Sequence, residues 1–425
     1  MQMAESRRGN ARIVNDHLDE LAGVLNLLRG AVELTRPDLV RASGLGRNVV
    51  SQRVAQLTGL GLVVEGSPAP STGGRAARGL RFKAEVGHVL VAELGATSTG
   101  VGVCDLNGHL LIQQCEPSDI TEGPERILGR VAEFFTNLLS SAHPGSLWGI
   151  GIGVPGPVEF SSGKPVAPPI MPGWDGFDVR GFFGDRFDAP TWVDNDVNVM
   201  ALGEFRDGLA QGRKNVIYVK VGTGIGAGLI SGGRLHRGTQ GCAGDIGHIT
   251  TILNSEVVCR CGQTGCLEAL AGGAALARQG ADAARTGESP YLAKLAAAGQ
   301  PINAAAVGQA ATFGDQKSVE LVTHSALLVG ETLSGLVNFF NPSLILLGGG
   351  VTEIGDLYLA GVRQMVLSRS LPLATRSLRI ERSPLGKTAG LKGAAFMVLD
   401  ELLSSERMAM WIDLGTPAGH PELAA

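Results

Sequence analysis

The sequence predicts an α/β protein whose body consists of two α/β halves around a cleft, preceded by a winged helix-turn-helix head. A strand, a glycine-rich turn and a second strand occur at 88–111 and again at 215–235. This repeat predicts an internal duplication with a phosphate-binding turn at each hinge. The first 83 residues instead show three helical patterns followed by two short strands around a Gly-Pro-Ser tip.

Length, charge and cysteine content narrow the class of protein. The chain has 425 residues, of which 44% are apolar and 18% charged, as in a folded protein of several domains. Residues 1–83 carry 12 Arg and Lys against 7 Asp and Glu, whereas the whole chain has a net charge of -4. A basic head on an acidic body predicts an anionic partner for the head. Unpaired cysteines and the lack of a signal peptide or a long apolar run predict a cytoplasmic protein with no membrane partner.

The head has the pattern of a helix-turn-helix domain. Apolar residues three and four positions apart predict a first helix from Ala11 to Arg29. Thr35 can cap a second helix with Pro37 in its first turn, and a third helix follows the SGLG turn. We interpret the third helix as the DNA-reading helix because its first turns are polar. Its candidate DNA contacts are Arg47, Asn48, Ser51, Gln52 and Arg53.

A predicted wing follows the third helix. Strands at 62–66 and 80–82 flank a segment rich in Gly, Pro and Ser, on whose tip we place Arg75 and Arg78. From there the two arginines could reach a minor groove. A solvated linker with two incidental arginines is the alternative. Because a reading helix, a wing and positive charge occur in this order, we predict double-stranded DNA as a partner.

Four potential metal ligands occur close together in the body. Cys259, Cys261 and Cys266 lie within eight residues, with Gly262 between them, and His248 lies eleven residues upstream. Three thiolates and one imidazole complete a tetrahedral sphere without an open position. We therefore predict a structural Zn²⁺ ion rather than a catalytic one. The alternative is a group of ordinary buried cysteines.

Polar residues suited to phosphoryl-group chemistry occur around the predicted cleft. Asp245 and Glu268 flank the metal motif, while Asn195 and Asp196 directly follow a predicted strand. A carboxylate at a strand end, facing phosphate-type turns, is placed to take a proton from a hydroxyl that attacks a phosphoryl group. Helix N-capping is the alternative role for Asn195 and Asp196. The candidate phosphate-binding residues are Gly95, Thr97, Gly222, Thr223, Gly224 and Gly226.

Residues 86–403 resemble the ROK family of repressors, open reading frames and sugar kinases, and the head resembles its repressor branch. The matching segments are GATSTG, GVPGPV, VDNDVNVMALGE, VGTGIGAGLI, GDIGH, CRCGQTGCLE and NPSLILLGGGV, in family order. The resemblance implies an actin-like, ribonuclease H-like fold with lobes at 84–195 and 196–403. Helical patterns from Ala269 to Phe340 are expected to supply core and a dimer surface. Residues 404–425 are expected to form a loose tail.

The resemblance also implies roles for single residues. It implies sugar contacts by Asn195, Asp196, Asp245, His248 and Glu268. In this family the residue matching His248 also binds zinc, and the one matching Asp196 is the general base of the kinases. Two positions depart from the pattern: Glu93 replaces an aspartate that organises the magnesium-phosphate end of ATP, and Asp245 replaces a glutamate. Mg²⁺ needs near-ideal geometry, and glutamate is one methylene longer than aspartate, so Glu93 argues against ATP-dependent transfer. ATP and Mg²⁺ are therefore expected only if the protein is an active kinase.

Two functions follow from these observations. The first is a DNA-binding transcriptional regulator, expected to be a repressor, whose body binds a sugar effector and which forms a homodimer or a tetramer. The second is an ATP-dependent hexose kinase that retains a DNA-binding head. Asp196 and the intact turn at 222–228 favour the kinase, whereas Glu93 and the fused head favour the regulator.

Overall fold

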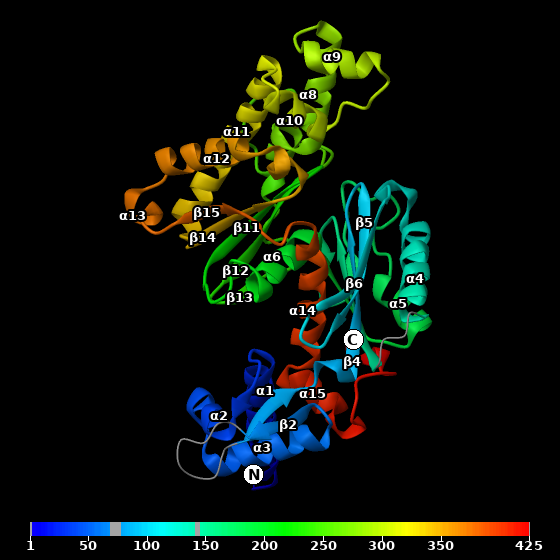
Figure 1. The fold of residues 1–425 in the computed structure, drawn as a ribbon, viewed down its shortest axis with the longest axis vertical. Coiled ribbons are helices and arrows are strands. Elements are labelled where there is room, and N and C mark those ends of the chain that lie inside the picture. Colours follow the sequence, from blue (N-terminus) through cyan, green and yellow to red (C-terminus); the bar gives the residue numbers. More distant parts are fainter. Residues whose placement is uncertain (1, 69–77, 141–144, 425) are drawn as a thin grey trace.

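The computed structural model describes residues 2–68, 78–140 and 145–424, with side chains described from Asp16 onward except at 67 and 68. The chain forms a small N-terminal head and two α/β lobes, each built on one five-stranded sheet. In Figure 1 the head lies at one end of an elongated molecule and the second lobe at the other, with the first lobe between them. No helix among the described residues is both long and apolar enough to cross a bilayer.

The head has three helices and a three-stranded sheet of order β1-β3-β2, which confirms the predicted winged helix-turn-helix. The buried face of α1 includes Leu21, Leu25 and Leu28, as its apolar spacing predicted. Thr35 caps α2 through a capping box with Asp38. The elements are α1 (Gln2–Arg29), β1 (Leu34–Thr35), α2 (Arg36–Ser43), α3 (Arg47–Gly59), β2 (Val63–Pro68) and β3 (Arg78–Phe82).

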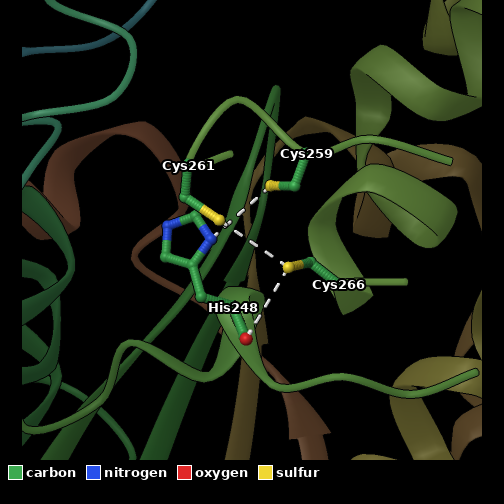
Figure 2. A group of neighbouring side chains, drawn as sticks. All are labelled: His248, Cys259, Cys261 and Cys266. Carbon is green, nitrogen blue, oxygen red and sulfur yellow. Dashed lines mark hydrogen bonds between the residues drawn. The ribbon is translucent and has the colours of Figure 1, made fainter. Parts of the chain in front are cut away.

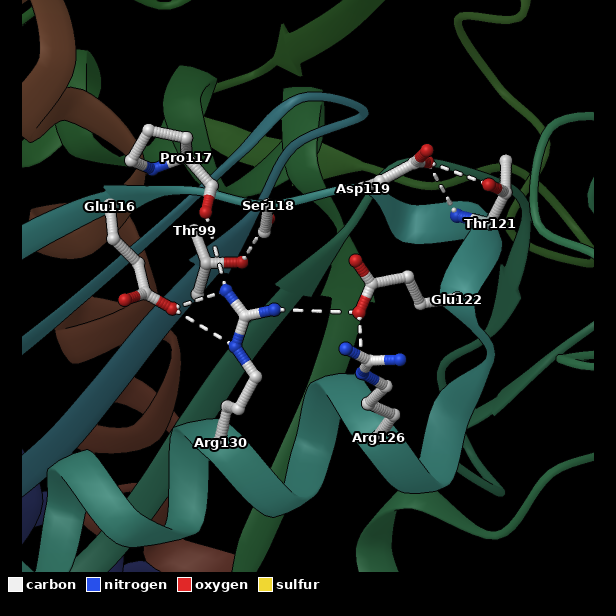
Figure 3. A network of polar contacts seen from close by, with 9 residues as sticks. All are labelled: Thr99, Glu116, Pro117, Ser118, Asp119, Thr121, Glu122, Arg126 and Arg130. Carbon is white, nitrogen blue, oxygen red and sulfur yellow. Dashed lines mark hydrogen bonds and ion pairs between the residues drawn. The ribbon is translucent and has the colours of Figure 1, made fainter.

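The first lobe contains a sheet of order β10-β7-β4-β5-β6. Its strands are β4 (Gly87–Leu94), β5 (Ser98–Asp105), β6 (Leu110–Pro117), β7 (Ser146–Val154) and β10 (Thr191–Asn195), with a small pair β8 (Val158–Glu159) and β9 (Lys164–Pro165). Helices α4 (Pro124–Ser140) and α5 (Val179–Phe187) accompany this sheet. A polar network joins α4 to the edge strand, because Arg130 donates to Glu116 and to the carbonyl oxygen of Pro117 (Figure 3).

The second lobe repeats this plan with a sheet of order β13-β12-β11-β14-β15. In both sheets a strand pairs antiparallel with the next strand and parallel with a later one, β4 with β5 and β7, and β11 with β12 and β14. The predicted duplication is therefore present in the topology. The strands are β11 (Val216–Val221), β12 (Ile225–Ser231), β13 (Arg234–His236), β14 (Leu344–Gly348) and β15 (Arg379–Arg382).

The helices of the second lobe cover one end of the molecule. The helical patterns predicted from Ala269 to Phe340 end in one long helix, α11 (Gln316–Phe340). The alanine-rich region before it divides into several shorter helices, because Gly272, Gly287 and Gly299 interrupt it. The remaining helices are α7 (Leu267–Ala271), α8 (Gly273–Thr286), α9 (Pro290–Ala297), α10 (Ala304–Thr312), α12 (Asp356–Arg369) and α13 (Pro372–Thr375).

Two helices pack between the lobes, α6 (Asp196–Asp207) and α14 (Ala389–Leu402). Their backbones come so close that a Cβ at Gly393 would lie 1.6 Å from the carbonyl oxygen of Val199. Glycine is therefore required there for the contact. Helix α14 also packs on β4 and β7. The predicted second lobe, 196–403, thus needs correction, because its last helix belongs by packing to the first sheet.

The expectation of a loose tail at 404–425 was wrong. Residues Ser405–Trp411 form α15, which packs against α1 of the head. Trp411 is fully buried, stacks edge-on against Trp148 at 5.5 Å between ring centroids, and donates its indole N–H to the carbonyl oxygen of Leu402 at 2.8 Å. The apolar residues Met408 and Trp411, three apart, bury one face of a short helix.

Candidate functional site

The candidate site is a cleft of about 1230 Å³ between the two lobes. Residues from both lobes line it, and they include every sugar-binding and phosphate-binding residue that the sequence predicted. These are Gly95, Thr97, Asn195, Asp196, Gly222, Thr223, Gly224, Gly226, Asp245, His248 and Glu268. The structure therefore brings together residues that are up to 173 positions apart in the chain, because the ends of the two sheets face each other.

The four predicted metal ligands lie together in one loop region of the second lobe (Figure 2). Their ligand atoms all lie within 4.8 Å of one another, with Cys259 Sγ 3.6 Å from His248 Nδ1 and Cys261 Sγ 3.7 Å from Cys266 Sγ. A tetrahedral ion with metal–sulfur bonds of about 2.3 Å places its sulfurs roughly 3.8 Å apart. The residues therefore fit a metal ion of this geometry.

The metal cluster positions a carboxylate of the cleft. Cys266 is the N-cap of α7, and Glu268 lies in the first turn of that helix. The Oε2 atom of Glu268 accepts a hydrogen bond of 3.0 Å from the backbone N–H of Ile225, directly after the Gly222–Gly224 turn. A Cβ at Gly224 would lie 2.1 Å from the same oxygen. The glycine thus makes room for Glu268, which connects the metal loop to the second turn.

Asn195 acts as a helix cap, the alternative role that the sequence left open. Its Oδ1 accepts from the backbone N–H groups of Val197 at 2.9 Å and Asn198 at 3.3 Å, and its Nδ2 donates to Gly156 O at 3.0 Å. These bonds hold the side chain at the N-terminus of α6. One amide hydrogen remains for a ligand hydroxyl.

Asp196 lies at the first position of α6 and faces the cleft, but it is already paired. Its Oδ2 lies 2.6 Å from the ammonium of Lys220, a residue that sequence reasoning missed. The same ammonium lies 3.8 Å from Glu93 Oε1. The sequence does contain a signal for this residue, because Lys220 is the one charged residue in the otherwise apolar strand β11.

Burial and charge act together on this group. Burial raises the pKa of Glu93 to about 7, and Lys220 opposes that rise only in part. Burial alone would lower the pKa of Lys220, yet Asp196 and Glu93 outweigh it and raise that pKa. Lys220 is therefore a fixed positive charge in the cleft.

Sequence reasoning also missed a second ion pair beside the site. Asp194 is 1% exposed and accepts from Arg237 Nε at 2.7 Å, while Asn198 donates to it at 2.9 Å. The guanidinium of Arg237 also lies over the ring of Phe160, 3.7 Å from its centroid. This pair joins the loop after β13 to the end of β10, so it connects the two lobes.

The two glycine-rich turns have the predicted positions. In the first, Gly95 N–H donates to Ser98 O at 2.7 Å; in the second, Gly222 N–H donates to Gly224 O at 2.9 Å. Gly226 differs from the prediction, since it lies within β12 rather than in the turn. Its hydrogen atoms leave room for α6, because a Cβ there would lie 3.0 Å from Val197 Cγ2.

The predicted DNA contacts divide into two groups. Arg47, Asn48, Ser51 and Gln52 share one exposed face of α3. Arg53 does not belong to this face, which corrects the prediction. It is 8% exposed and donates from Nη2 to Glu20 Oε2 of α1 at 2.8 Å. Residue 53 lies on the side of α3 that packs on α1, so its ion pair with Glu20 joins these two helices of the head.

The wing is described only in part. Arg75 lies outside the described residues. Arg78 is described, and it lies at the first position of β3 rather than on the tip, which corrects that placement. Its guanidinium is exposed and lies 3.2 Å from Glu65 of β2. Glu65 also pairs with Arg36, at the start of α2, at 2.8 Å.

The fold and the cleft define the class of this protein: an actin-like, two-lobed body of the sugar-kinase type with a winged helix-turn-helix head. The sequence matches the ROK family over residues 89–401, and the chain belongs to that family. A ROK family transcriptional regulator, a homologue of the Escherichia coli MLC protein, has a similar structure with a TM-score of 0.78. The two are 24% identical, and the match covers 94% of this chain and 99% of that one.

Curated proteins of two kinds are similar to this chain in sequence. A xylose repressor from Caldicellulosiruptor bescii is 30% identical over 374 residues, 87% of this chain and 93% of the relative. A glucokinase from Halalkalibacterium halodurans is 31% identical over 317 residues, 74% of this chain and 96% of the relative. A ROK family glucokinase from Streptomyces griseus, solved with glucose and AMPPNP, has a TM-score of 0.63 at 28% identity and covers 73% of this chain and 98% of its own.

Proposed function

We propose that this protein is a sugar-responsive, DNA-binding transcriptional repressor whose ROK body binds a sugar or sugar derivative. The observation that carries the proposal is the physical connection between the cleft and the head. Helix α6 begins in the cleft, and α14 packs along α6. Helix α15 follows α14 and packs against α1 of the head. The match to a repressor over 87% of the chain, against 74% for a glucokinase, supports the same function.

The effector is proposed to bind through hydroxyl groups. Asp245, His248 and Glu268 line one side of the cleft, and charged acceptors bond hydroxyls strongly. We propose that the ion held by His248 and the three cysteines is Zn²⁺, because thiolate and imidazole ligands in a closed tetrahedron suit it. Its role is to hold the loop that carries Glu268 and His248 in one geometry.

DNA binding is proposed to use the exposed face of α3 in the major groove. Two such helices must lie about 34 Å apart to read a palindrome, so the active form is a symmetric homodimer. A sugar that closes the cleft changes the affinity for the operator only by its preference for one of the two conformations.

The test is an operator-binding assay on the full chain. A DNA fragment selected from a random pool serves as the probe, and fluorescence anisotropy is measured with and without each member of a panel of neutral and phosphorylated sugars. A sugar that changes the operator affinity by about fivefold or more supports the proposal. Absence of sequence-specific binding at low salt would overturn it.

An ATP-dependent hexose kinase is the second candidate. The turn at Gly222–Gly224 and the N-terminus of α8 lie at one end of the cleft, and backbone N–H groups in such positions bind phosphates. A coupled assay for ADP release across the same sugars distinguishes the candidates. Turnover that Asp196→Asn abolishes would favour the kinase.

A further inference from the structure

The ammonium group of Lys220 crosses the cleft between the two lobes. Lys220 is next to last in β11 of the second lobe, whereas Glu93 belongs to β4 and Asp196 follows β10 in the first. The side chain is 18% exposed, and its two carboxylate partners are 13% and 6% exposed. This is a largely buried group of three charges.

We infer that Lys220 is a built-in cation that takes the place of a metal ion between Glu93 and Asp196, and so makes the cleft a binding site that does not transfer a phosphoryl group. The inference rests on the proposed function, since it assumes that the cleft binds a sugar. It assigns to Lys220 a positioning role, exerted through Asp196.

Lys220 supplies positive charge where a metal ion would otherwise be attracted. Two carboxylates at the surface of a polar cleft, with no cation between them, repel each other and attract a divalent cation. Here the ammonium at 2.6 Å from Asp196 and 3.8 Å from Glu93 supplies the positive charge. An ammonium, unlike Mg²⁺, has no coordination positions for phosphate oxygens. The ammonium therefore offsets one of the two negative charges without creating a place for a nucleotide-bound metal.

Lys220 also occupies one oxygen of Asp196, the candidate general base. To take a proton from a sugar hydroxyl, Asp196 needs an oxygen within about 2.6–3.2 Å of that hydroxyl. Its Oδ2 already accepts from Lys220 at 2.6 Å, and the side chain is only 6% exposed. The ammonium thus holds the carboxylate toward β11. In this arrangement Asp196 can accept a hydrogen bond from a bound hydroxyl through its other oxygen, but its orientation is set by Lys220.

The side chain of Glu93, one methylene longer than aspartate, reaches the first turn of α14. A Cβ at Gly390 would lie 2.1 Å from Glu93 Oε2, so glycine at that position makes room for the longer side chain. Glu93 is therefore accommodated as one of the two partners of Lys220. The departure from the family's aspartate and the presence of the lysine belong to one arrangement.

The experiment compares divalent-cation binding by full-length, zinc-loaded proteins, with Mn²⁺ as the probe in isothermal titration calorimetry. Lys220→Met is expected to bind Mn²⁺ at least about tenfold more tightly than the wild type, because two carboxylates lose their internal cation. Adding Asp196→Asn to that variant is expected to abolish the gain, and Lys220→Arg to behave as the wild type. Lys214→Met, an exposed lysine just before the same strand, is the matched control. Equal Mn²⁺ affinity of Lys220→Met and the wild type would overturn the inference.

A second measurement uses the wild type and Asp196→Asn, and so does not depend on how Lys220→Met folds. The wild type is incubated with Mg-ATP and each sugar that raises its melting temperature. No ADP release is expected. Release that Asp196→Asn abolishes would contradict the inference even if operator binding responds to the sugar. Failure of the proposed function would look different, because no sugar would then change operator affinity.

Discussion

Arg206 on α6 donates a hydrogen bond to the carboxylate of Asp400 on α14, although the two residues are 194 positions apart in the chain. Both helices begin at the cleft, and α14 leads to α15 and the head. Burial lowers the pKa of Arg29, the last residue of α1, to about 10, and the negative charge of Asp400 opposes this decrease. The pair therefore lies between the cleft and the DNA-binding head.

Arg206→Met is expected to weaken the effect of the sugar on operator binding while leaving sugar affinity nearly unchanged. Coupling energies between two sites are typically about 1–3 kcal/mol, and we expect most of this to be lost. The measurement is operator affinity with and without sugar. The control, Arg285→Met, removes an exposed pair with Asp282 on α8. An unchanged sugar response in Arg206→Met would contradict the prediction.

Trp411→Ala is expected to lower the free energy of unfolding by about 3–5 kcal/mol, as for other fully buried tryptophans. The cause is the loss of its packing on Trp148 and of its hydrogen bond to Leu402. Denaturant unfolding followed by intrinsic fluorescence and by circular dichroism measures the change. Met410→Ala, at a position that is 48% exposed, should cost less than about 0.5 kcal/mol. Equal midpoints for the two variants would show that the C-terminal helix is not docked in solution.

Cys261→Ser is expected to remove the bound metal and to weaken sugar binding by at least about tenfold, since the loop that carries Glu268 loses its support. Metal content is measured by atomic emission, and sugar binding by the shift in melting temperature. The head lies apart from this loop, so affinity for non-specific DNA should not change. Cys242→Ser, at an exposed cysteine outside the cluster, is the control. Full metal content in Cys261→Ser would rule out its role as a ligand.

Asn48→Ala is expected to reduce operator affinity by about 1–3 kcal/mol without changing affinity for non-specific DNA, because this side chain lies on the exposed face of α3. Arg53→Met is expected to act differently, lowering the stability of the head through loss of its pair with Glu20. Anisotropy titrations and thermal unfolding separate the two effects. An equal loss on both kinds of DNA would exclude base reading by Asn48.

Glu93→Gln is expected to change the dependence of stability on pH. The folded protein holds a proton on Glu93 with a pKa of about 7, above its ordinary value of 4.5, so it binds that proton more tightly than the unfolded chain does. Wild-type stability should therefore fall as pH rises from about 4.5 to 7, by at most about 3 kcal/mol. The variant should lack this contribution. Denaturant unfolding at several pH values measures the difference, and parallel curves would contradict the assignment.

Local patterns were sufficient to predict the head, the duplicated sheets and the metal motif. The capping box at Thr35 and the spacing of Leu21, Leu25 and Leu28 express local preferences of helices, so each could be found from neighbouring residues. The cysteines could be found for the same reason, since three of the four ligands lie within eight residues.

The sequence by itself thus determined the classes of element, the two glycine-rich turns and the metal motif, because helix periodicity, turn chemistry and metal-ligand spacing are properties of short segments. Only the tertiary structure decided that Lys220 pairs with Asp196, that Arg53 pairs with Glu20 and that Trp411 packs against Trp148. Each of these contacts joins segments at least 24 residues apart. Such pairings depend on how whole elements pack, because burial and charge neutralisation select partners in space and not along the chain.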